Sequence, residues 1–241
     1  MSVLRVIITF FLVLGSYLTL KSQEEITFDR PGITDLYNIT TKNKFQFEVG
    51  YDYLSFIEKQ ESYPSFTIRY GLNKKTELRY IFDYSFYNDK MIKNYDSNNI
   101  NLQCLGLKKH IVKFKNNVNV SLILNAKIPL NLNQNFYGFD AIAVIQKEFK
   151  SFDLISNIGT VYENNQFKNQ LFLGNCFSLN LGKKSAIFLE DYYFFGKEVK
   201  HGNILGYTYS SSQKSQIDFS MGMLNYQTKS FFWGVGFSYR L

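Results

Sequence analysis

The sequence predicts an all-β fold, an antiparallel transmembrane β-barrel of about twelve strands preceded by a cleaved signal peptide. Three observations predict it. Apolar and polar residues alternate with a period of two, the alternating segments run about ten residues, and no apolar run after residue 22 is long enough for a membrane helix. Strands of soluble proteins average about five or six residues, so the length favours a membrane barrel over a soluble β-sandwich. An aromatic content of 18% and only 3 prolines in 241 residues agree with this.

Residues 1–22 are predicted to be a signal peptide. Arg5 supplies its positive charge, Val6 to Leu14 its apolar stretch, and Leu20-Lys21-Ser22 its cleavage site. The apolar stretch is too short to cross a bilayer as a helix, and a short membrane anchor is the alternative. Residues 23–43 are expected to form an N-terminal periplasmic segment or plug, and residues 44–241 the barrel.

The strands follow from the alternation. Between residues 44 and 53, apolar odd positions alternate with polar or small even ones, and successive side chains on a strand point to opposite faces. The predicted strands lie near residues 44–53, 65–72, 77–86, 98–108, 118–128, 138–149, 152–163, 166–179, 185–195, 203–210, 215–223 and 230–241. The facing is ambiguous in 98–108, at Glu190-Asp191 and at Asn175.

The connections and the last strand fit a barrel of an outer membrane. Outer-membrane barrels have longer outer loops and shorter inner turns. The expected outer loops are 54–64, 88–97, 129–137, 164–165, 196–202 and 224–229, and the expected inner turns are 73–75, 109–117, 150–151, 180–184 and 211–214. The last strand, Phe231 to Leu241, alternates aromatic residues with small ones. Such an ending predicts recognition by the barrel assembly machinery of a Gram-negative bacterium.

The polar faces of these strands are expected to line the barrel lumen. The residues expected there are Glu48, Asp52, Arg69, Glu77, Arg79, Asp83, Lys127, Asp140, Glu148, Asp153, Glu163, Asp218 and Arg240. Nine acids and four bases make this set acidic, although the chain carries a net charge of +7. Since unpaired buried charge is costly, acids and bases should pair. The set either lines a solute path or fills the interior with hydrogen-bonded side chains.

The excess lysines fall mostly in expected loops and turns, for example Lys74, Lys75, Lys183 and Lys184. Lysines dispersed in this way form no stripe for nucleic acid, so no nucleic-acid partner is expected. They either solubilise the loops or contact the headgroups of anionic lipid. Outer-membrane lipid is the expected surrounding.

Residues 23–43 lack strand alternation and contain both proline and glycine. We expect this segment to fold into the periplasmic mouth, with Arg30 meeting the lumen carboxylates. Asp29, Arg30 and Pro31 are the plug candidates. The alternative is a flexible lead-in to the first strand.

Thr27 to Asp35 resembles the Thr-Asp-Arg-Pro-Asp-Phe-Thr-Glu opening of a bacterial barrel family, the MetA-pathway of phenol degradation family, with Phe28 and Gly32 departing from it. The likeness continues in order over nearly the whole mature chain, in Leu105–Lys108, Leu122–Pro129, Ile155–Gly159, Gln216–Ser220 and Gly236–Arg240. The resemblance implies an outer-membrane transporter for small organic solutes. The Phe, Tyr and Asn content and the Ser22-Gln23 junction resemble a Bacteroidota precursor.

An enzyme is not expected. A barrel hydrolase such as outer-membrane phospholipase A needs a serine activated by a histidine, but His110 falls in an expected inner turn and His201 in an outer loop. Cys104 and Cys176 are expected to be free thiols, with a single bridge between them as the alternative. Two isolated histidines and these two cysteines make no metal site, and no cofactor motif is present. The leading expectation for function is passive transport of small solutes, including hydrophobic or aromatic ones. The alternatives are a non-conducting structural or surface-interaction barrel and, last, a hydrolase.

Overall fold

The computed structural model describes residues 29, 32–55, 59–83, 86–89, 102–130, 137–164, 167–197, 199–225 and 229–241. The expected signal peptide therefore lies outside the described residues. The strand segments are β1 (Phe45–Ser55), β2 (Lys59–Asn73), β3 (Thr76–Asp83), β4 (Phe86–Asp89), β5 (Leu102–Lys113), β6 (Val118–Pro129), β7 (Gly138–Glu148), β8 (Phe152–Glu163), β9 (Phe167–Asn180), β10 (Ser185–Phe195), β11 (Val199–Ser212), β12 (Ser215–Asn225) and β13 (Lys229–Arg240).

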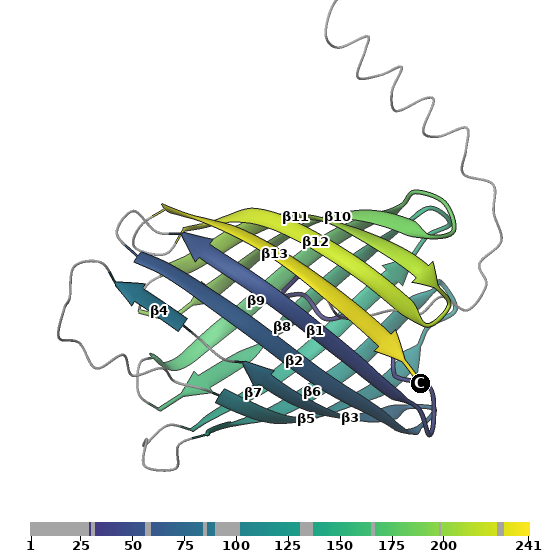
Figure 1. The fold of residues 1–241 in the computed structure, drawn as a ribbon. Coiled ribbons are helices and arrows are strands. Elements are labelled where there is room, and N and C mark those ends of the chain that lie inside the picture. Colours follow the sequence, from purple (N-terminus) through teal and green to yellow (C-terminus); the bar gives the residue numbers. More distant parts are fainter. Residues whose placement is uncertain are drawn as a thin grey trace, which may run out of the picture.

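These segments close into a single antiparallel β-barrel (Figure 1). Both β3 and β4 pair with β2, one after the other, so the thirteen described segments occupy twelve positions around the barrel. β3 pairs with β5, and from β5 to β13 each strand pairs with the next one in sequence. β1 pairs with both β2 and β13, which closes the sheet. The predicted fold, an all-β antiparallel barrel of twelve strands, is confirmed. We call the end with the short described connections the inner end, and the opposite end the outer end.

The strand limits differ from the predicted ones where backbone pairing continues past the alternating pattern. β2 begins at Lys59, inside the expected outer loop 54–64. β5 (Leu102–Lys113) continues past the predicted end at residue 108, because its ladder with β6 extends to Lys113 opposite Asn119, and residues 98–101 lie outside the described residues. β11 begins at Val199, so His201 lies on a strand and not in a loop. Backbone hydrogen bonds do not depend on side-chain type, so they extend a strand wherever a neighbouring strand runs alongside.

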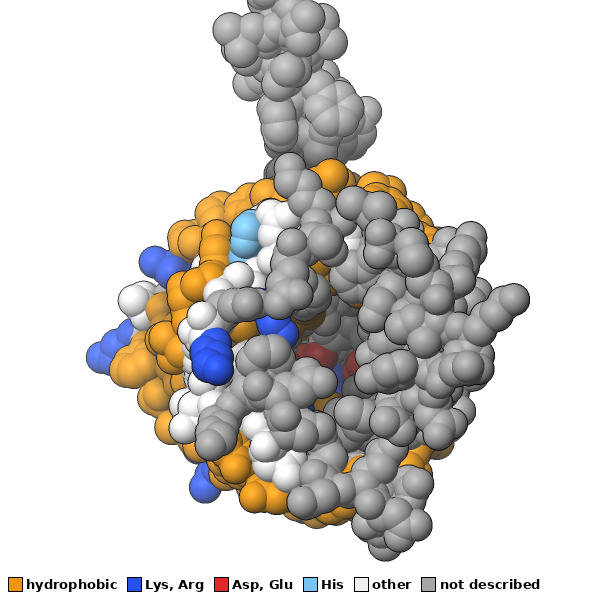
Figure 2. Space-filling model, turned by 90° about the vertical axis from the view of Figure 1, so that its left-hand side faces the viewer, with side chains coloured by type: hydrophobic (Ala, Val, Ile, Leu, Met, Phe, Trp, Pro, Cys, Tyr) orange, Lys and Arg blue, Asp and Glu red, His pale blue; other side chains and the backbone are white. Residues whose placement is uncertain are grey.

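The barrel is apolar outside and polar inside. Outward side chains include Leu105 and Met223, which are 56% and 63% exposed, whereas Glu77 and Asn119 are fully buried. Figure 2 shows hydrophobic side chains around the outer surface and acidic and basic side chains in the central hollow. This pattern reverses that of a soluble protein and matches barrels whose outer wall contacts lipid. Among the described residues, no helix is both long and apolar enough to span a membrane.

One part of the interior is apolar as well. A cluster of inward side chains includes Ile142 and Val144 of β7 and Phe172 of β9, and Leu36 and Tyr37 of the N-terminal segment pack against it. Burial of apolar area stabilises by about 25 cal/mol per Å². The middle of β7 is thus apolar on both faces, because one face meets the outside and Ile142 and Val144 on the other belong to this cluster.

The N-terminal segment joins the barrel wall at Gly71 of β2. Lys42 forms a parallel bridge with Gly71, the Asn43 amide donates to the Gly71 carbonyl (2.7 Å), and the Gly71 amide donates to the Lys44 carbonyl (3.1 Å). A Cβ at position 71 would collide with the backbone carbonyls of Thr40 and Thr41. Glycine is therefore required for this close approach.

We expect Gly71→Ala to lower the free energy of unfolding by about 1–3 kcal/mol, because the colliding atoms belong to the backbone and cannot rotate away. Urea unfolding of the refolded barrel in detergent micelles measures this. Gly196→Ala is the matched control, since its Cβ would meet only the side chain of Gln170, at 3.1 Å. An equal loss in both variants would contradict the role of Gly71.

Candidate functional site

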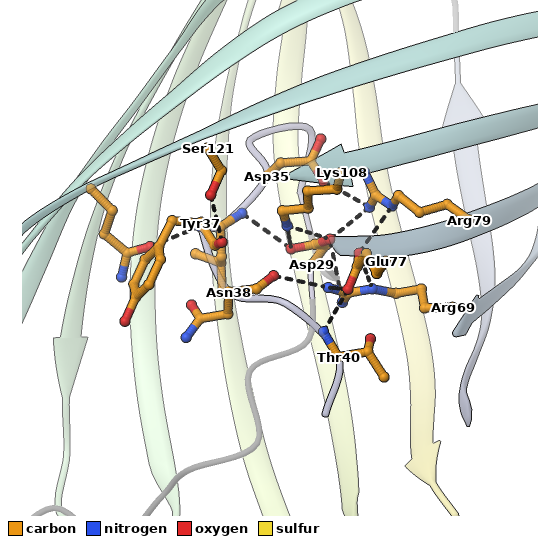
Figure 3. Close-up of polar contacts among 12 residues, drawn as sticks. Asp29, Asp35, Tyr37, Asn38, Thr40, Arg69, Glu77, Arg79, Lys108 and Ser121 are labelled. Carbon is orange, nitrogen blue, oxygen red and sulfur yellow. Dashed lines mark hydrogen bonds and ion pairs between the residues drawn. The ribbon is translucent and has the colours of Figure 1, made fainter. Parts of the chain in front are cut away.

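A buried group of charged side chains lies between the N-terminal segment and strands β1, β2, β3 and β5 (Figure 3). We call it the anchor cluster. Its members are Asp29, Asp35, Glu48, Arg69, Glu77, Arg79 and Lys108. Alternation on the strands points these wall residues inward, so three bases and four acids meet inside the barrel.

Arg69 is the centre of the anchor cluster. Its Nε lies 2.9 Å from Glu77 Oε1, and its Nη1 lies 3.1 Å from Glu48 Oε1. Its Nη2 donates to Glu77 Oε2 (3.0 Å) and to the Asn38 carbonyl (3.3 Å). The Arg69 side chain is 1% exposed. A planar guanidinium with five donors suits such a site, because it bonds two carboxylates and a carbonyl at once.

Asp29 links the N-terminal segment to all three bases. Its carboxylate lies 2.6 Å from Arg79 Nη2, 3.1 Å from Lys108 Nζ and 3.3 Å from Arg69 Nη1. Burial alone would raise the pKa of Asp29, but Arg69, Lys108 and Arg79 outweigh it and hold that pKa well below its usual range. Asp29 is therefore ionised and tightly paired at neutral pH.

Asp35 makes the second acidic contact from the segment. Its Oδ1 lies 2.8 Å from Arg79 Nη2. Burial raises the pKa of Asp35, Arg79 opposes that rise, and the neighbouring Asp29 adds to it. Asp29 forms ion pairs with three bases, whereas Asp35 forms one, with Arg79. Asp29 is therefore the stronger anchor.

Hydrogen bonds from several strands hold the rest of the segment. Glu190 Oε1 of β10 accepts from the amides of Ile33 (2.8 Å) and Thr34 (2.9 Å). Asn157 of β8 accepts from the Asp35 amide (2.8 Å) and donates to the Asp35 carbonyl (2.9 Å). The segment therefore lies inside the barrel and is bound to opposite walls.

Three further contacts continue this pattern along the segment toward β1. Ser121 of β6 donates to the Tyr37 carbonyl (2.8 Å), and the Tyr37 hydroxyl donates to Glu148 of β7 (2.9 Å). The Thr40 amide donates to Glu77 (2.6 Å). Polar wall residues thus satisfy the backbone of a segment that has no secondary structure of its own.

We expect Glu190→Leu to speed amide hydrogen exchange at Ile33 and Thr34 by about tenfold or more, because each amide loses its acceptor. Glu190→Gln should change exchange far less, since its amide oxygen can still accept. Hydrogen–deuterium exchange with peptide-level mass spectrometry measures both variants. Equal exchange in Glu190→Leu and the unsubstituted chain would mean that Glu190 does not hold the segment.

The structure brings some of the residues expected in the lumen into clusters and leaves others apart. Glu48, Arg69, Glu77 and Arg79 belong to the anchor cluster. Lys127, Asp140 and Glu163 form a second group, in which Lys127 Nζ lies 3.0 Å from Asp140 and 3.2 Å from Glu163. Glu148 binds Tyr37 as above, Arg240 donates to Thr41 Oγ1 (3.1 Å), Asp218 is buried, Asp153 lines a cavity and Asp52 lies beside Gly234. Asp83 ends β3, and its side chain lies outside the described part. A solute path along these residues stays a prediction.

The plug candidates divide differently. Asp29 lies in the anchor cluster, whereas Arg30 and Pro31, and with them the expected contact of Arg30 with lumen carboxylates, lie outside the described residues. The contact that the structure does describe has the opposite sign, an acid of the segment meeting bases of the wall. Lys108 and Glu190 were not among the expected lumen residues.

Two cavities border the segment. The larger, about 350 Å³, is lined by residues that include Ile33, Lys127, Asp140, Glu163, Phe172 and Phe194. The rings of Phe172 and Phe194 lie 5.0 Å apart between centroids. The smaller, about 140 Å³, is lined by Asp29, Thr34 and Asp153 among others. The larger cavity has an aromatic wall and a charged wall, which suits a small amphipathic molecule.

A serine–histidine contact exists but lacks the geometry of a catalytic pair. Ser121 Oγ lies 3.5 Å from His110 Nδ1, and the serine hydroxyl already donates to the Tyr37 carbonyl. Ser121 is fully buried, so a substrate could not reach it. His201 contacts Asn225 Nδ2 (2.8 Å). Across the described ranges, no group of three or more His, Cys, Asp or Glu side chains is placed to hold a metal ion, and Cys104 and Cys176 are free thiols.

No protein-family model matches this sequence, and no curated protein is similar to it in sequence. Solved structures do match. The COG4313 outer membrane channel from Pseudomonas putida F1 aligns with a TM-score of 0.70 at 9% identity, over 85% of this chain and 98% of the channel. The NanC porin aligns with a TM-score of 0.62 at 9% identity (81% and 100% covered), and the KdgM porin in complex with disordered oligogalacturonate with 0.59 at 9% (80% and 98%). The chain has the fold of outer-membrane channel β-barrels.

Proposed function

We propose that this protein is a passive channel of the Gram-negative outer membrane for small organic solutes that carry both an aromatic or other apolar part and a polar group. The observation that carries the proposal is the larger cavity inside the barrel, beside the N-terminal segment. The fold it shares with the outer-membrane channels named above supports it.

The cavity walls define the solute class. The rings of Phe172 and Phe194 are tilted against each other and both line the cavity, so one wall offers apolar contact. On the other wall, Lys127 bridges Asp140 and Glu163. A solute with an apolar ring and a polar substituent would contact both walls. A strongly hydrated sugar of the same size would lose water without an apolar contact in return.

Several narrower assignments belong to this proposal. Residues 1–22 would be a signal peptide, residues 23–43 a plug, and β13 the signal that the barrel assembly machinery recognises. The chain would belong to the MetA-pathway of phenol degradation family and would have no catalytic activity. The charged lumen residues, Asp83 and Asp153 included, would line the solute path.

Uptake by proteoliposomes tests the proposal. The full refolded chain should admit an aromatic acid such as benzoate faster than a sugar of similar size, and Phe172→Ala should reduce that preference several-fold. Phe177→Ala is the matched control, because Phe177 lies on the same strand but faces outward, 42% exposed. Equal preference in Phe172→Ala and the unsubstituted chain would remove the aromatic wall from the mechanism.

A second candidate is a non-conducting structural or surface-interaction barrel. The anchor cluster favours it, because ion pairs join the segment to three strands across the lumen. Folded protein that admits no solute, with or without residues 29–43, would support this candidate over the channel.

A further inference from the structure

Four polar side chains lie next to one another on the outer surface of the barrel, one on each of the consecutive strands β8 to β11. They are Ser156, Asn175, Asp191 and Asn203, which we call the polar row. In the strand register, each residue is directly opposite the next. Ser156 Oγ donates to Asn175 Oδ1 (2.9 Å). The row is therefore continuous across four strands.

The row faces outward. Glu190 bonds the N-terminal segment inside the barrel, so its neighbour Asp191 points to the other face. Leu189 and Leu205 share the face of the row, and they are 56% and 52% exposed. Each member also lies at least four residues from either end of its strand. The polar row thus crosses the middle of the surface that lipid would cover.

Polar groups at this position are costly in lipid. A hydrocarbon layer offers no hydrogen bonds, and a charged side chain on the lipid face destabilises a barrel. The Asp191 carboxylate has no hydrogen bond or ion pair with any residue in the described ranges. On β1, β12 and β13, by contrast, the outward side chains inside the strands are apolar or aromatic, for example Val49, Phe219 and Val235. Only something outside the barrel can satisfy the row.

We propose that the polar row is the centre of a lateral interface with a second copy of this chain in the membrane. A two-fold axis along the membrane normal brings identical residues of two copies to the same depth. The row contains its own complement, since the amides of Asn175 and Asn203 donate and the carboxylate of Asp191 accepts. Hydrogen bonds between such groups hold membrane segments together.

The surroundings of the row suit the same partner. Leu154 and Ile158 flank it on β8, and Leu189 and Leu205 flank it on β10 and β11. A second copy would cover these side chains with its own and would exclude lipid from the polar row. An unrelated membrane protein would need a matching polar row at the same depth, whereas a second copy has one by identity.

The oligomeric state in lipid tests this proposal. The full chain, labelled with donor or acceptor dyes and reconstituted in phospholipid vesicles, should show energy transfer that persists on dilution with lipid. Asn175→Leu/Asp191→Leu/Asn203→Leu should lower the dimer fraction at least tenfold. The control triple variant, Phe47→Leu/Val49→Leu/Val235→Leu on the outward faces of β1 and β13, which carry none of the row, should not change it. Heat-modifiable migration on gels confirms folding of each variant.

Cysteine cross-linking gives an independent result. In a Cys104→Ser/Cys176→Ser background, Asn203→Cys should cross-link two copies in the membrane and Val49→Cys should not. A monomeric unsubstituted chain in vesicles, or a dimer that survives loss of the row, would overturn the proposal. A monomer that binds a lipid headgroup, with that lipid lost in the row variant, would also overturn the proposal. The polar row would then be a lipid-binding site.

Discussion

Arg69→Met is expected to lower the free energy of unfolding of the barrel by about 3–5 kcal/mol, the largest stability loss we expect from a single side chain. Glu48, Glu77 and Asp29 all pair with Arg69. Without it, the anchor cluster holds four acids and two bases, and Glu48 loses its only base in the cluster. A buried carboxylate without a counter-charge costs far more than the pair itself contributes.

Urea unfolding in detergent micelles, followed by loss of heat-modifiable migration, measures the change. Arg240→Met is the matched control, because Arg240 contacts Thr41 at the exposed inner end and is not part of the cluster. Arg69→Met/Glu77→Gln should recover part of the loss by removing one uncompensated acid. A loss in Arg69→Met no greater than in Arg240→Met would show that the cluster is open to water.

Alternation along the sequence predicts the barrel because every strand has one face toward lipid and the other toward the polar interior. It fails where a strand meets something else inside. The middle of β7 is apolar on both faces because Ile142 and Val144 belong to the interior cluster that Leu36 and Tyr37 pack against. The facing of Glu190 and Asp191 could not be chosen from the pattern, since it depends on the hydrogen bonds that Glu190 accepts from the amides of Ile33 and Thr34.

The anchor cluster was predictable in part for the same reason. Glu48, Arg69, Glu77 and Arg79 lie on cleanly alternating strands, so parity alone places them inside. Lys108 lies on β5, where both parities are apolar, and beside a Lys109-His110 pair that resembles a turn. No spacing in the sequence indicates that Asp29 reaches three bases on other strands, because that contact depends on the path of residues 32–44 inside the barrel.

Acidification should not release the segment between pH 7 and about pH 5. Burial raises the pKa of Asp29, but the nearby charges of Arg69, Lys108 and Arg79 outweigh that effect and hold the pKa below its ordinary value of 3.8. The stability that Asp29 contributes is therefore complete above its unfolded pKa and is lost only as the pH falls through its lower folded pKa. A substitution, and not a mild change of pH, is the way to remove this anchor.

Asp29→Asn is expected to raise the open probability of the channel at least tenfold in planar bilayers while changing barrel stability much less than Arg69→Met. The substitution leaves three acids and three bases in the anchor cluster, so the wall stays balanced, and the new amide oxygen still accepts from Lys108. The segment, however, loses its ion pairs with all three bases and keeps only the weaker contact through Asp35. An equilibrium shift of about 1.4 kcal/mol is enough for a tenfold change.

Single-channel recording of the refolded chain measures this, with deletion of residues 29–43 as the upper limit. Asp218→Asn is the matched control, because Asp218 is a buried interior carboxylate on β12 outside the anchor cluster. An open probability in Asp29→Asn equal to that of Asp218→Asn, together with a large rise on deletion, would mean that the hydrogen bonds to Glu190 and Asn157 hold the segment without the ion pairs. Equal conductance in the full chain and the deletion variant would mean that the segment does not obstruct the lumen, and the ion pairs would then serve barrel stability alone.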